Sequence, residues 1–500
     1  MFKSDGTNIT VDLSPVDGEG AVRLTAGDRV LYEGSVAGGL KLEVDGRSWG
    51  VPDAVLELLS QKLPPVSTYS PNAFAPLATP FVTLSSLNML AGGETPTWTT
   101  QGSIQGQTIP ISVLAGSLHY AQSVFEGAKT FFVRHEDGRV EARMFRPRKN
   151  ARRLWRSARH MGVPLERSDW KGMRLTEDRF ADFYEEMTRE AVQVNAAGGL
   201  FEGAFMPIDR SDPQHSWDAT PRSLYLRPIL FATGAVLGVK PASHYTFAVY
   251  TTPAGRYRSD LVLRVERERA RAYPGGTGAV KAACNYAPTL PMMSELVANR
   301  ARATAETPWK EVYDDILFLS RDGLVEEMGG ANFFLLGEEG GQLVLRTPPS
   351  TQDSADADTI LPGVTRDTVL QLAELLGLVV EVGPIPISRL TELSVADARK
   401  TAVFTTGTAA GVAPVVALLD RQGSPEFAVW DDVSDAARRR RLTADHGPPG
   451  SALAAGRLLR TVLFRIQLGD EEGLRELIPD RADAILAHVR EQNWVQSFFV

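Results

Sequence analysis

Lys281 lies in a segment whose composition suits a reactive amine. Three glycines within residues 274–278 precede it, small residues follow it, and Tyr286 comes five positions later. Because only the deprotonated amine is a nucleophile, burial or a neighbouring cation activates a lysine by lowering its pKa. Two other interpretations stay open from these residues alone. One is a phosphate-binding loop, although the spacing differs from G-x-x-x-x-G-K-[ST] and Ala282 occupies the hydroxyl position, and the other is a tight turn followed by a solvated lysine.

A pair of carboxylates, Glu326 and Glu327, runs into Gly329 and Gly330 and then into an apolar stretch that reaches Phe334. An unpaired buried carboxylate costs several kcal/mol, so a carboxylate used here for chemistry requires a cationic or donating partner. The sequence does not identify that partner, and a helix cap or a turn is the alternative role.

The segment Leu361–Asp367 leads into an expected helix whose apolar residues recur at i, i+3, i+4 and i+7 from Val369. Thr365 suits the N-cap of this helix. The amides of Gly363, Val364 and Thr365 then lie at a helix amino terminus, where they can bind an anion such as phosphate. Every capped helix has such amides, so this signal is not specific by itself.

A second anion site is predicted where the expected strand Thr401–Thr405 opens into Thr406–Gly411. Hydroxyl groups and unhindered amides at the end of a strand suit a phosphate or a carboxylate.

The run Ser223–Pro228 alternates strictly, which places Tyr225 and Arg227 on one face of a strand. An arginine and a tyrosine that project together can receive a carboxylate. A solvent-facing edge strand is the alternative, because proline is tolerated at sheet edges.

The composition narrows the class of protein. A length of 500 residues allows about three domains, and 43% apolar with 23% charged residues is typical of soluble globular proteins. The net charge of −8 argues against a nucleic-acid partner, and the single cysteine, Cys284, excludes an intrachain disulfide. No signal or transit segment and no membrane-spanning apolar run is evident, so we expect a cytoplasmic protein without a membrane or metal partner.

We expect four regions in the chain: a β-rich amino-terminal extension of unknown role over residues 1–88, a small α/β domain over 89–252, a linker over 253–257, and a large domain over 258–500 that carries Lys281. Strands are expected at residues 22–32, 40–49, 111–120, 127–133 and 140–145, helices at 53–63, 150–160, 178–195, 451–468 and 481–492, and a surface insertion around Arg438.

Taken together, these residues resemble the branched-chain amino acid aminotransferases, which are pyridoxal phosphate enzymes of fold type IV. The resemblance implies an α+β, two-domain aminotransferase-like fold, with the amino-terminal β-rich extension added. The matching segments follow the family's order between about residues 80 and 420: Ser117–Gly127, Phe145–Ala158, Ser223–Pro228, Gly275–Tyr286, Glu326–Phe334, Leu361–Asp367 and Gly407–Ala409.

The resemblance implies roles around the cofactor, pyridoxal 5'-phosphate. Lys281 holds it covalently and later moves the proton between the substrate's α carbon and the cofactor. Glu327 keeps the pyridine nitrogen protonated, which makes the ring an electron sink, and Tyr286 hydrogen-bonds its phenolic oxygen. The phosphate is held by Arg153, Thr408 and the amides of Val364 and Thr365, and the cofactor site is completed by Asn332, Leu361, Gly363 and Gly407.

The resemblance also implies a substrate pocket that accepts either an aliphatic side chain or the side-chain carboxylate of glutamate. Arg227 and Tyr225 serve the second task, and the amides of Thr408 and Ala409 receive the α-carboxylate. Two subunits complete each other's sites in this family, so a homodimer is expected. The substrate contacts are Tyr120, Phe125, Tyr225, Arg227, Gly330 and Ala409.

The expected reaction moves an amino group between a branched or apolar L-amino acid and 2-oxoglutarate by a ping-pong mechanism. A lyase of the same fold that acts on an aminated chorismate is one alternative, and a scaffold without catalysis is another. Ala282–Cys284 stands where the family usually has two glycines, and the chain is longer than the usual family outline. These departures leave open a specialised transaminase that makes an unusual amino acid.

Overall fold

The computed structural model describes residue 79 and residues 81–89, 95–105, 109–201, 208–209, 223–254, 261–302, 313–398, 400–428 and 451–500, together with short strands within residues 1–50. The chain divides into two compact units, Met1–Pro65 and Val66–Val500. The expected helix at 53–63 and the expected insertion around Arg438 lie outside the described residues.

The amino-terminal unit contains the β structure that the sequence predicts. Its pairings are antiparallel and local, since each strand pairs with a close neighbour in sequence. The strands are β1 (Lys3–Ser4), β2 (Thr7–Asn8), β3 (Pro15–Val16), β4 (Ala21–Ala26), β5 (Arg29–Ser35), β6 (Lys41–Val44) and β7 (Arg47–Gly50).

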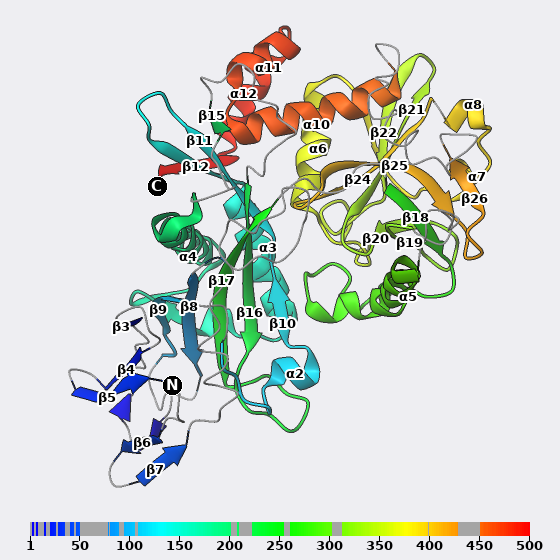
Figure 1. The fold of residues 1–500 in the computed structure, drawn as a ribbon. Helices are drawn as coiled ribbons and strands as arrows, with labels where there is room; N and C mark the ends of the chain where they lie inside the picture. The colour runs from blue at the N-terminus through cyan, green and yellow to red at the C-terminus, as the bar shows by residue number, and fades with distance from the viewer. Residues whose placement is uncertain are drawn as a thin grey trace. The chain divides into compact units, whose positions relative to one another are not determined.

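The second unit begins with a largely antiparallel sheet (Figure 1), along which the strands follow the order β27-β12-β11-β16-β17-β8-β9. Two short strands pair beside this path, β10 with β16 and β15 with β11. The bounds are β8 (Phe81–Asn88), β9 (Trp98–Gln105), β10 (Ser123–Phe125), β11 (Ala128–Arg134), β12 (Val140–Phe145), β15 (Ile208–Asp209), β16 (Ser223–Ala232), β17 (His244–Ala254) and β27 (Val495–Phe499).

Two long helices bury the apolar face of this sheet: α3 (Pro147–His160) and α4 (Glu177–Asn195) pack on each other, and α4 contacts β8 and β17. Pro147 opens α3, where its missing N–H costs nothing, and the Thr176 hydroxyl caps α4 by accepting from the Arg179 amide. The core between helices and sheet is rich in Phe, Trp and Leu side chains. The remaining local elements are α2 (Gly116–Tyr120), β13 (Asp169–Trp170), β14 (Met173–Arg174), η2 (Leu165–Arg167) and η3 (Ala196–Leu200).

The carboxyl-terminal half builds a second sheet in the order β20-β19-β18-β25-β24-β21-β22-β23. Because β20 also pairs with β21, the sheet curls back on itself near Glu327. The strands are β18 (Leu261–Glu266), β19 (Asp315–Leu319), β20 (Val325–Met328), β21 (Asn332–Glu339), β22 (Gln342–Thr347), β23 (Val379–Val382), β24 (Ala402–Gly407), β25 (Gly411–Leu419) and β26 (Pro425–Ala428).

Helix α10 (Ala452–Leu468) joins the two sheets, since it contacts β11 and β12 as well as β21, β24 and β25 (Figure 1). After α11 and α12 the chain returns to the first sheet, where β27 pairs with β12. Among the described residues, no helix combines the length and the apolar character needed to cross a bilayer. The helices of this half are α5 (Leu290–Arg302), α6 (Val364–Leu375), α7 (Ser388–Thr391), α8 (Val395–Ala398), α11 (Glu471–Leu477), α12 (Ala482–Glu491) and the 3-10 helix η4 (Ala283–Thr289).

The structure corrects two local predictions. The expected strand at 111–120 contains a short helix, α2, and its apolar residues Val113, Leu114 and Leu118 are exposed rather than paired in a sheet. Helix α6 starts two residues earlier than expected, with Gly363 as its N-cap and Thr365 within the first turn.

Two expected region boundaries also differ from the strands. Strand β8 belongs to the first sheet although the extension was expected to reach residue 88, and β17 runs to Ala254, past the expected start of the linker at 253. Both boundaries were placed from composition, which does not reveal the strands that a segment pairs with.

Candidate active site

The backbone at Lys281 is fixed from both sides. Its amide donates to the Ser157 hydroxyl on α3 at 3.0 Å, and its carbonyl accepts from the Phe125 amide at 3.1 Å. A side chain at Gly278 would be 2.5 Å from the Thr359 carbonyl oxygen, so the loop before the lysine requires a glycine at that position. Lys281 therefore belongs to the junction between the two sheets, which argues against the interpretation of a solvated lysine after a turn.

Helix η4 places Tyr286 beside the lysine. The Lys281 Nζ donates to the Tyr286 hydroxyl at 3.0 Å, and it lies 4.9 Å from the centre of the Phe125 ring. The Asn285 amide group donates to the carbonyls of Thr277 and Val280, both at 2.7 Å, which ties the start of η4 to the glycine-rich loop. The amine, the phenol and an aromatic wall are thus assembled from residues close in sequence and from β10.

The buried carboxylate predicted near the glycine pair is Glu327, and its cationic partner is Arg271. Their Oε1 and Nη2 atoms are 2.6 Å apart, and the same oxygen accepts from the Leu361 amide at 2.9 Å. The second oxygen accepts from the Asn332 side chain at 3.0 Å. Burial raises the pKa of Glu327, and the charge of Arg271 opposes that rise. Since a carboxylate has about four acceptor positions, this one keeps the capacity for a further donor such as a ring N–H.

Arg271 was not identified from the sequence. It stands in a run with Arg264, Arg267 and Arg269, of which Arg264 is also buried, and nothing in the sequence of that run shows which arginine pairs with Glu327. Only the pairing with Glu327, which is distant in sequence, reveals it.

Arg271→Met should destabilise the protein by about 3–5 kcal/mol, because it leaves the Glu327 carboxylate buried without its cation. Chemical denaturation measures this loss. The matched control is Arg267→Met, which breaks an exposed ion pair with Glu426 and should cost about 1 kcal/mol or less. Equal losses in both variants would contradict the assigned role of Arg271.

The predicted phosphate ligands meet at the start of α6. The N-cap Gly363 has no side chain to satisfy the first amides, so those of Val364 and Thr365 have no acceptor within the helix. A side chain at Gly363 would overlap the Asn332 Oδ1, which explains the glycine. A small cavity joins this helix start to the turn after β24, and its lining is Ala128, Lys129, Phe145, Asn150, Val364, Thr365, Gly407, Thr408, Gly411 and Gln467.

Arg153 lies next to the start of α6, and it is held by Glu126, which was not predicted from the sequence. It makes two bonds of 2.7 Å to Glu126, a residue with no exposed surface, and its Nη1 donates to the Pro362 carbonyl at 3.2 Å. Such a two-pronged pair fixes the guanidinium plane beside the loop before α6. A direct contact between Arg153 and the phosphate stays a prediction.

The predicted carboxylate receptor forms one cluster with the lysine. Arg227 Nη2 donates to the Tyr225 hydroxyl at 3.1 Å, and the guanidinium lies 4.6 Å from the centre of the Phe125 ring. That ring in turn is 5.3 Å from the ring of Tyr286. Within the described part of the chain, the buried Nε of Arg227 has no hydrogen-bond partner, so the cluster holds a donor available to an anionic group.

The other predicted substrate contacts are placed differently. A side chain at Gly330 would be 4.0 Å from the Tyr286 ring, so this residue borders the site. The Ala409 carbonyl accepts from Lys129, which lines the small cavity at the start of α6, at 2.9 Å. Tyr120 instead lies on α2 and donates to the Leu237 carbonyl. None of the described contacts of Tyr120 reaches Lys281 within one protomer.

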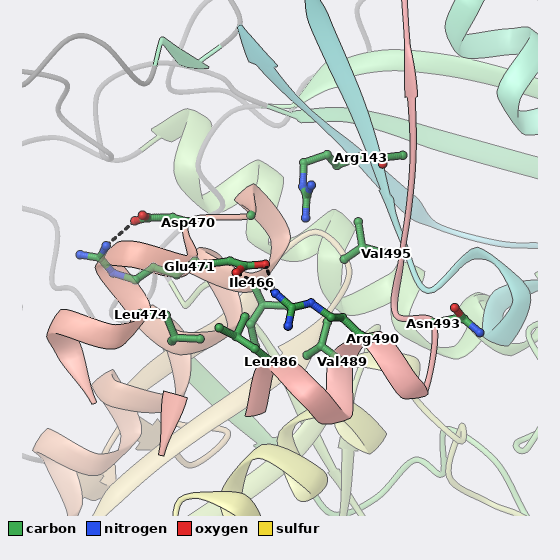
Figure 2. A pocket seen from close by; sticks show the side chains of 13 residues that line it. Arg143, Ile466, Asp470, Glu471, Leu474, Leu486, Val489, Arg490, Asn493 and Val495 are labelled. Atoms are coloured by element: carbon green, nitrogen blue, oxygen red, sulfur yellow. Dashed lines mark hydrogen bonds and ion pairs between the residues drawn. The ribbon is translucent and has the colours of Figure 1, made fainter. Parts of the chain in front are cut away.

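A larger cavity, of about 330 Å³, lies among α10, α11, α12 and the strands β12 and β27. Figure 2 shows an aliphatic floor below Glu471 and Arg490, which pair with each other, with Arg143 above. None of the predicted cofactor or substrate residues lines it. Among the described residues, no group of three or more His, Cys, Asp or Glu side chains could hold a metal ion.

Together the observed groups fit pyridoxal phosphate. The chain supplies an amine beside a phenol, a buried carboxylate with a remaining acceptor position, and helix-start amides without acceptors. The amine suits the aldehyde of the cofactor, the carboxylate suits its ring nitrogen, and the helix-start amides suit its phosphate.

Comparison with known proteins agrees with this arrangement. Residues 213–418 match the family model described as amino-transferase class IV. The chain is 35% identical over 333 residues to the mitochondrial branched-chain-amino-acid aminotransferase 1 of Arabidopsis thaliana, covering 65% of this chain and 70% of the relative. It is 33% identical over 357 residues to the branched-chain-amino-acid aminotransferase of Mycobacterium tuberculosis, covering 70% of this chain and 78% of the relative.

Solved structures show the same fold. The branched-chain aminotransferase of Thermoproteus uzoniensis, crystallised with norvaline, has a TM-score of 0.50 at 21% identity and covers 83% of this chain and 99% of its own. The enzyme of Thermobaculum terrenum in its pyridoxal phosphate form has a TM-score of 0.50 at 20% identity, covering 84% and 98%. The chain therefore belongs to the branched-chain amino acid aminotransferase family, transaminases of fold type IV whose cofactor is pyridoxal 5'-phosphate.

Proposed function

We propose that this protein transfers the amino group of a branched-chain or other apolar L-amino acid to 2-oxoglutarate in two successive half-reactions. The observation that carries the proposal is the contact cluster in which the Lys281 amine, the Tyr286 hydroxyl, the Phe125 ring and the Arg227 guanidinium adjoin one another. When bound, the cofactor supplies the electron sink that stabilises negative charge on the substrate's α carbon.

The chain's own residues supply binding and proton transfer. Lys281 Nζ, held by Tyr286, is the base that would remove the proton from the α carbon and deliver it to the cofactor. Glu327, held in place by Asn332 and Arg271, would accept a hydrogen bond from the ring nitrogen, and its charge would favour the protonated ring. The helix-start amides of Val364 and Thr365 would hold the phosphate.

One pocket has to accept two different substrates, so it needs both apolar surface and hydrogen-bond donors. The face of Phe125 offers apolar surface to an aliphatic side chain, and Arg227 with Tyr225 offers donors to the second carboxylate of glutamate. The buried Nε of Arg227 supports this assignment, since an unused buried donor costs free energy until an acceptor arrives.

A half-reaction assay tests the function. Holoenzyme is mixed with one L-amino acid at a time, without an oxo acid, and loss of the absorbance of the lysine-bound cofactor is followed. Leucine, isoleucine, valine and glutamate should each discharge the band. No discharge by any L-amino acid despite bound cofactor would overturn the proposal, and pyruvate released from an aminated chorismate without 2-oxoglutarate would favour the lyase alternative.

We also propose a homodimer in which α2 and the loop after β16 form the contact. Val113, Leu118, Leu237 and Val239 are large apolar residues that are 59–88% exposed. The two segments adjoin, because the Val236 amide donates to the Leu114 carbonyl at 2.9 Å. An exposed apolar patch of this kind is typical of an interface. Its edge carries Tyr120, which this arrangement would deliver to the site of the partner.

The double variant Leu237→Asp/Val239→Asp should be monomeric and should lose most transaminase activity, because charge in the contact opposes association. Light scattering after gel filtration gives the mass. Leu477→Asp alters a partly exposed leucine on α11 and should leave the mass unchanged. A fully active wild-type monomer would refute the dimer. A cytoplasmic location stays a prediction from the sequence.

A further inference from the structure

Lys129 connects the start of β11 to the turn between β24 and β25. Its Nζ donates to the Ala409 carbonyl at 2.9 Å, and two residues earlier the Gly127 carbonyl accepts from the Thr408 hydroxyl, also at 2.9 Å. Both bonds link segments about 280 residues apart in sequence. The turn that is predicted to bind an anion is therefore held at two points, by Gly127 just before β11 and by Lys129 within β11.

The surroundings of Lys129 are unusual for a lysine. Burial, together with the charge of Arg460 on α10, lowers its pKa to about 8. Tyr225 is its neighbour across the ladder on β16, and Ala409 contributes a carbonyl. None of the described residues that line the adjacent cavity is acidic. A desolvated cation without a carboxylate is costly unless an anion completes the site.

We propose that Lys129 is a positioning residue for oxyanion binding: it fixes the Thr408–Ala410 turn and adds positive charge to the cavity where the substrate α-carboxylate or the cofactor phosphate is held. Because the peptide group is planar and trans, holding the Ala409 oxygen also fixes the direction of the Ala410 N–H. The proposal rests on the transaminase function above and adds a residue that none of the predicted contacts includes.

The main test compares Lys129→Met and Lys129→Arg with wild-type holoenzyme. The probe is 4-methylpentanoate, a substrate-sized carboxylate whose lack of an amine keeps its charge constant above neutral pH. Removing one charge-assisted hydrogen bond should weaken its binding, or that of pyridoxal phosphate, by about 10- to 100-fold. Weaker probe binding identifies the α-carboxylate as the anion, weaker cofactor binding identifies the phosphate, and Lys129→Arg should recover part of either loss.

A pH series separates this role from a structural one. In the wild type, affinity for the identified anion should fall as the pH rises through about 8, because Lys129 loses its proton there, and this decline should be absent from Lys129→Met. Unfolding is not the cause. Between pH about 8 and the ordinary lysine value of 10.5 the folded state binds fewer protons than the unfolded state, so the contribution of Lys129 to stability increases with pH.

The control is Lys171→Met, which removes an exposed lysine paired with Glu186 and should change neither affinity. Unchanged anion affinities and an unchanged pH profile in Lys129→Met would overturn the inference. If wild-type holoenzyme shows no half-reaction with any L-amino acid, the proposed function fails instead. The two failures are thus distinguishable, because anion and cofactor binding are measured without turnover.

Discussion

Lys281→Ala should abolish the visible absorbance of the lysine-bound cofactor and reduce transamination by about 10⁴-fold or more, the scale observed when an enzyme loses its reacting nucleophile. The lysine is fixed through its backbone, by Ser157 and by the Phe125 amide. Truncating the side chain therefore removes the amine without disturbing the polypeptide that carries it. Pyridoxal phosphate should still bind without a covalent bond, because Val364, Thr365 and Thr408 are untouched.

Absorbance spectra and single-turnover assays of the purified variant measure both effects. Lys171→Met serves again as the control, since its side chain is exposed and lies in the hairpin between β13 and β14. The assignment of Lys281 would fail if Lys281→Ala kept the absorbance band, or if the control lost it.

Glu327→Gln should keep the covalent cofactor and lower kcat by about 10²- to 10³-fold, the usual loss when one preorganised electrostatic contact is removed. Glutamine retains the shape and can still accept from Leu361 or Asn332, but it has no charge to favour a protonated ring nitrogen. It also leaves the Arg271 cation buried without its carboxylate, so the single variant should be less stable than the wild type.

A double variant separates stability from catalysis. Glu327→Gln/Arg271→Met removes both buried charges and should recover stability relative to either single variant, while kcat stays low. Glu326→Gln is the matched control: Glu326 is a buried neighbour that feels the charge of Arg271, but the ion pair of Arg271 is made with Glu327. A normal kcat in Glu327→Gln together with a low kcat in Glu326→Gln would contradict the account, because the role would then belong to Glu326.

The site was predictable from the sequence where its chemistry is local. Tyr286 lies on the short helix η4 that begins just after Lys281, and Tyr225 and Arg227 lie two apart on a strand, so each pair is close in sequence. The hairpin strand β12 over Val140–Phe145 matches its expected bounds for the same reason.

Groups paired over long distances in sequence were not predictable. Arg271 and Glu126 each find their partner through the tertiary fold, and a basic run or a single acid does not specify a partner. The return of β27 to β12 is a similar case, because a short terminal strand has no sequence signal for the sheet it joins. The prediction of a strand at 111–120 was wrong at α2, where Leu118 and the preceding residues Val113 and Leu114 are exposed instead of paired in a sheet.

The covalent attachment of the cofactor to one lysine can be measured directly. Holoenzyme is reduced with borohydride, which makes the lysine–cofactor bond permanent, and the digested protein is analysed by mass spectrometry. The account predicts the phosphopyridoxyl mass on the peptide that contains Lys281, at close to one group per chain. The label on a different lysine, or no label on protein that contains the cofactor, would contradict it.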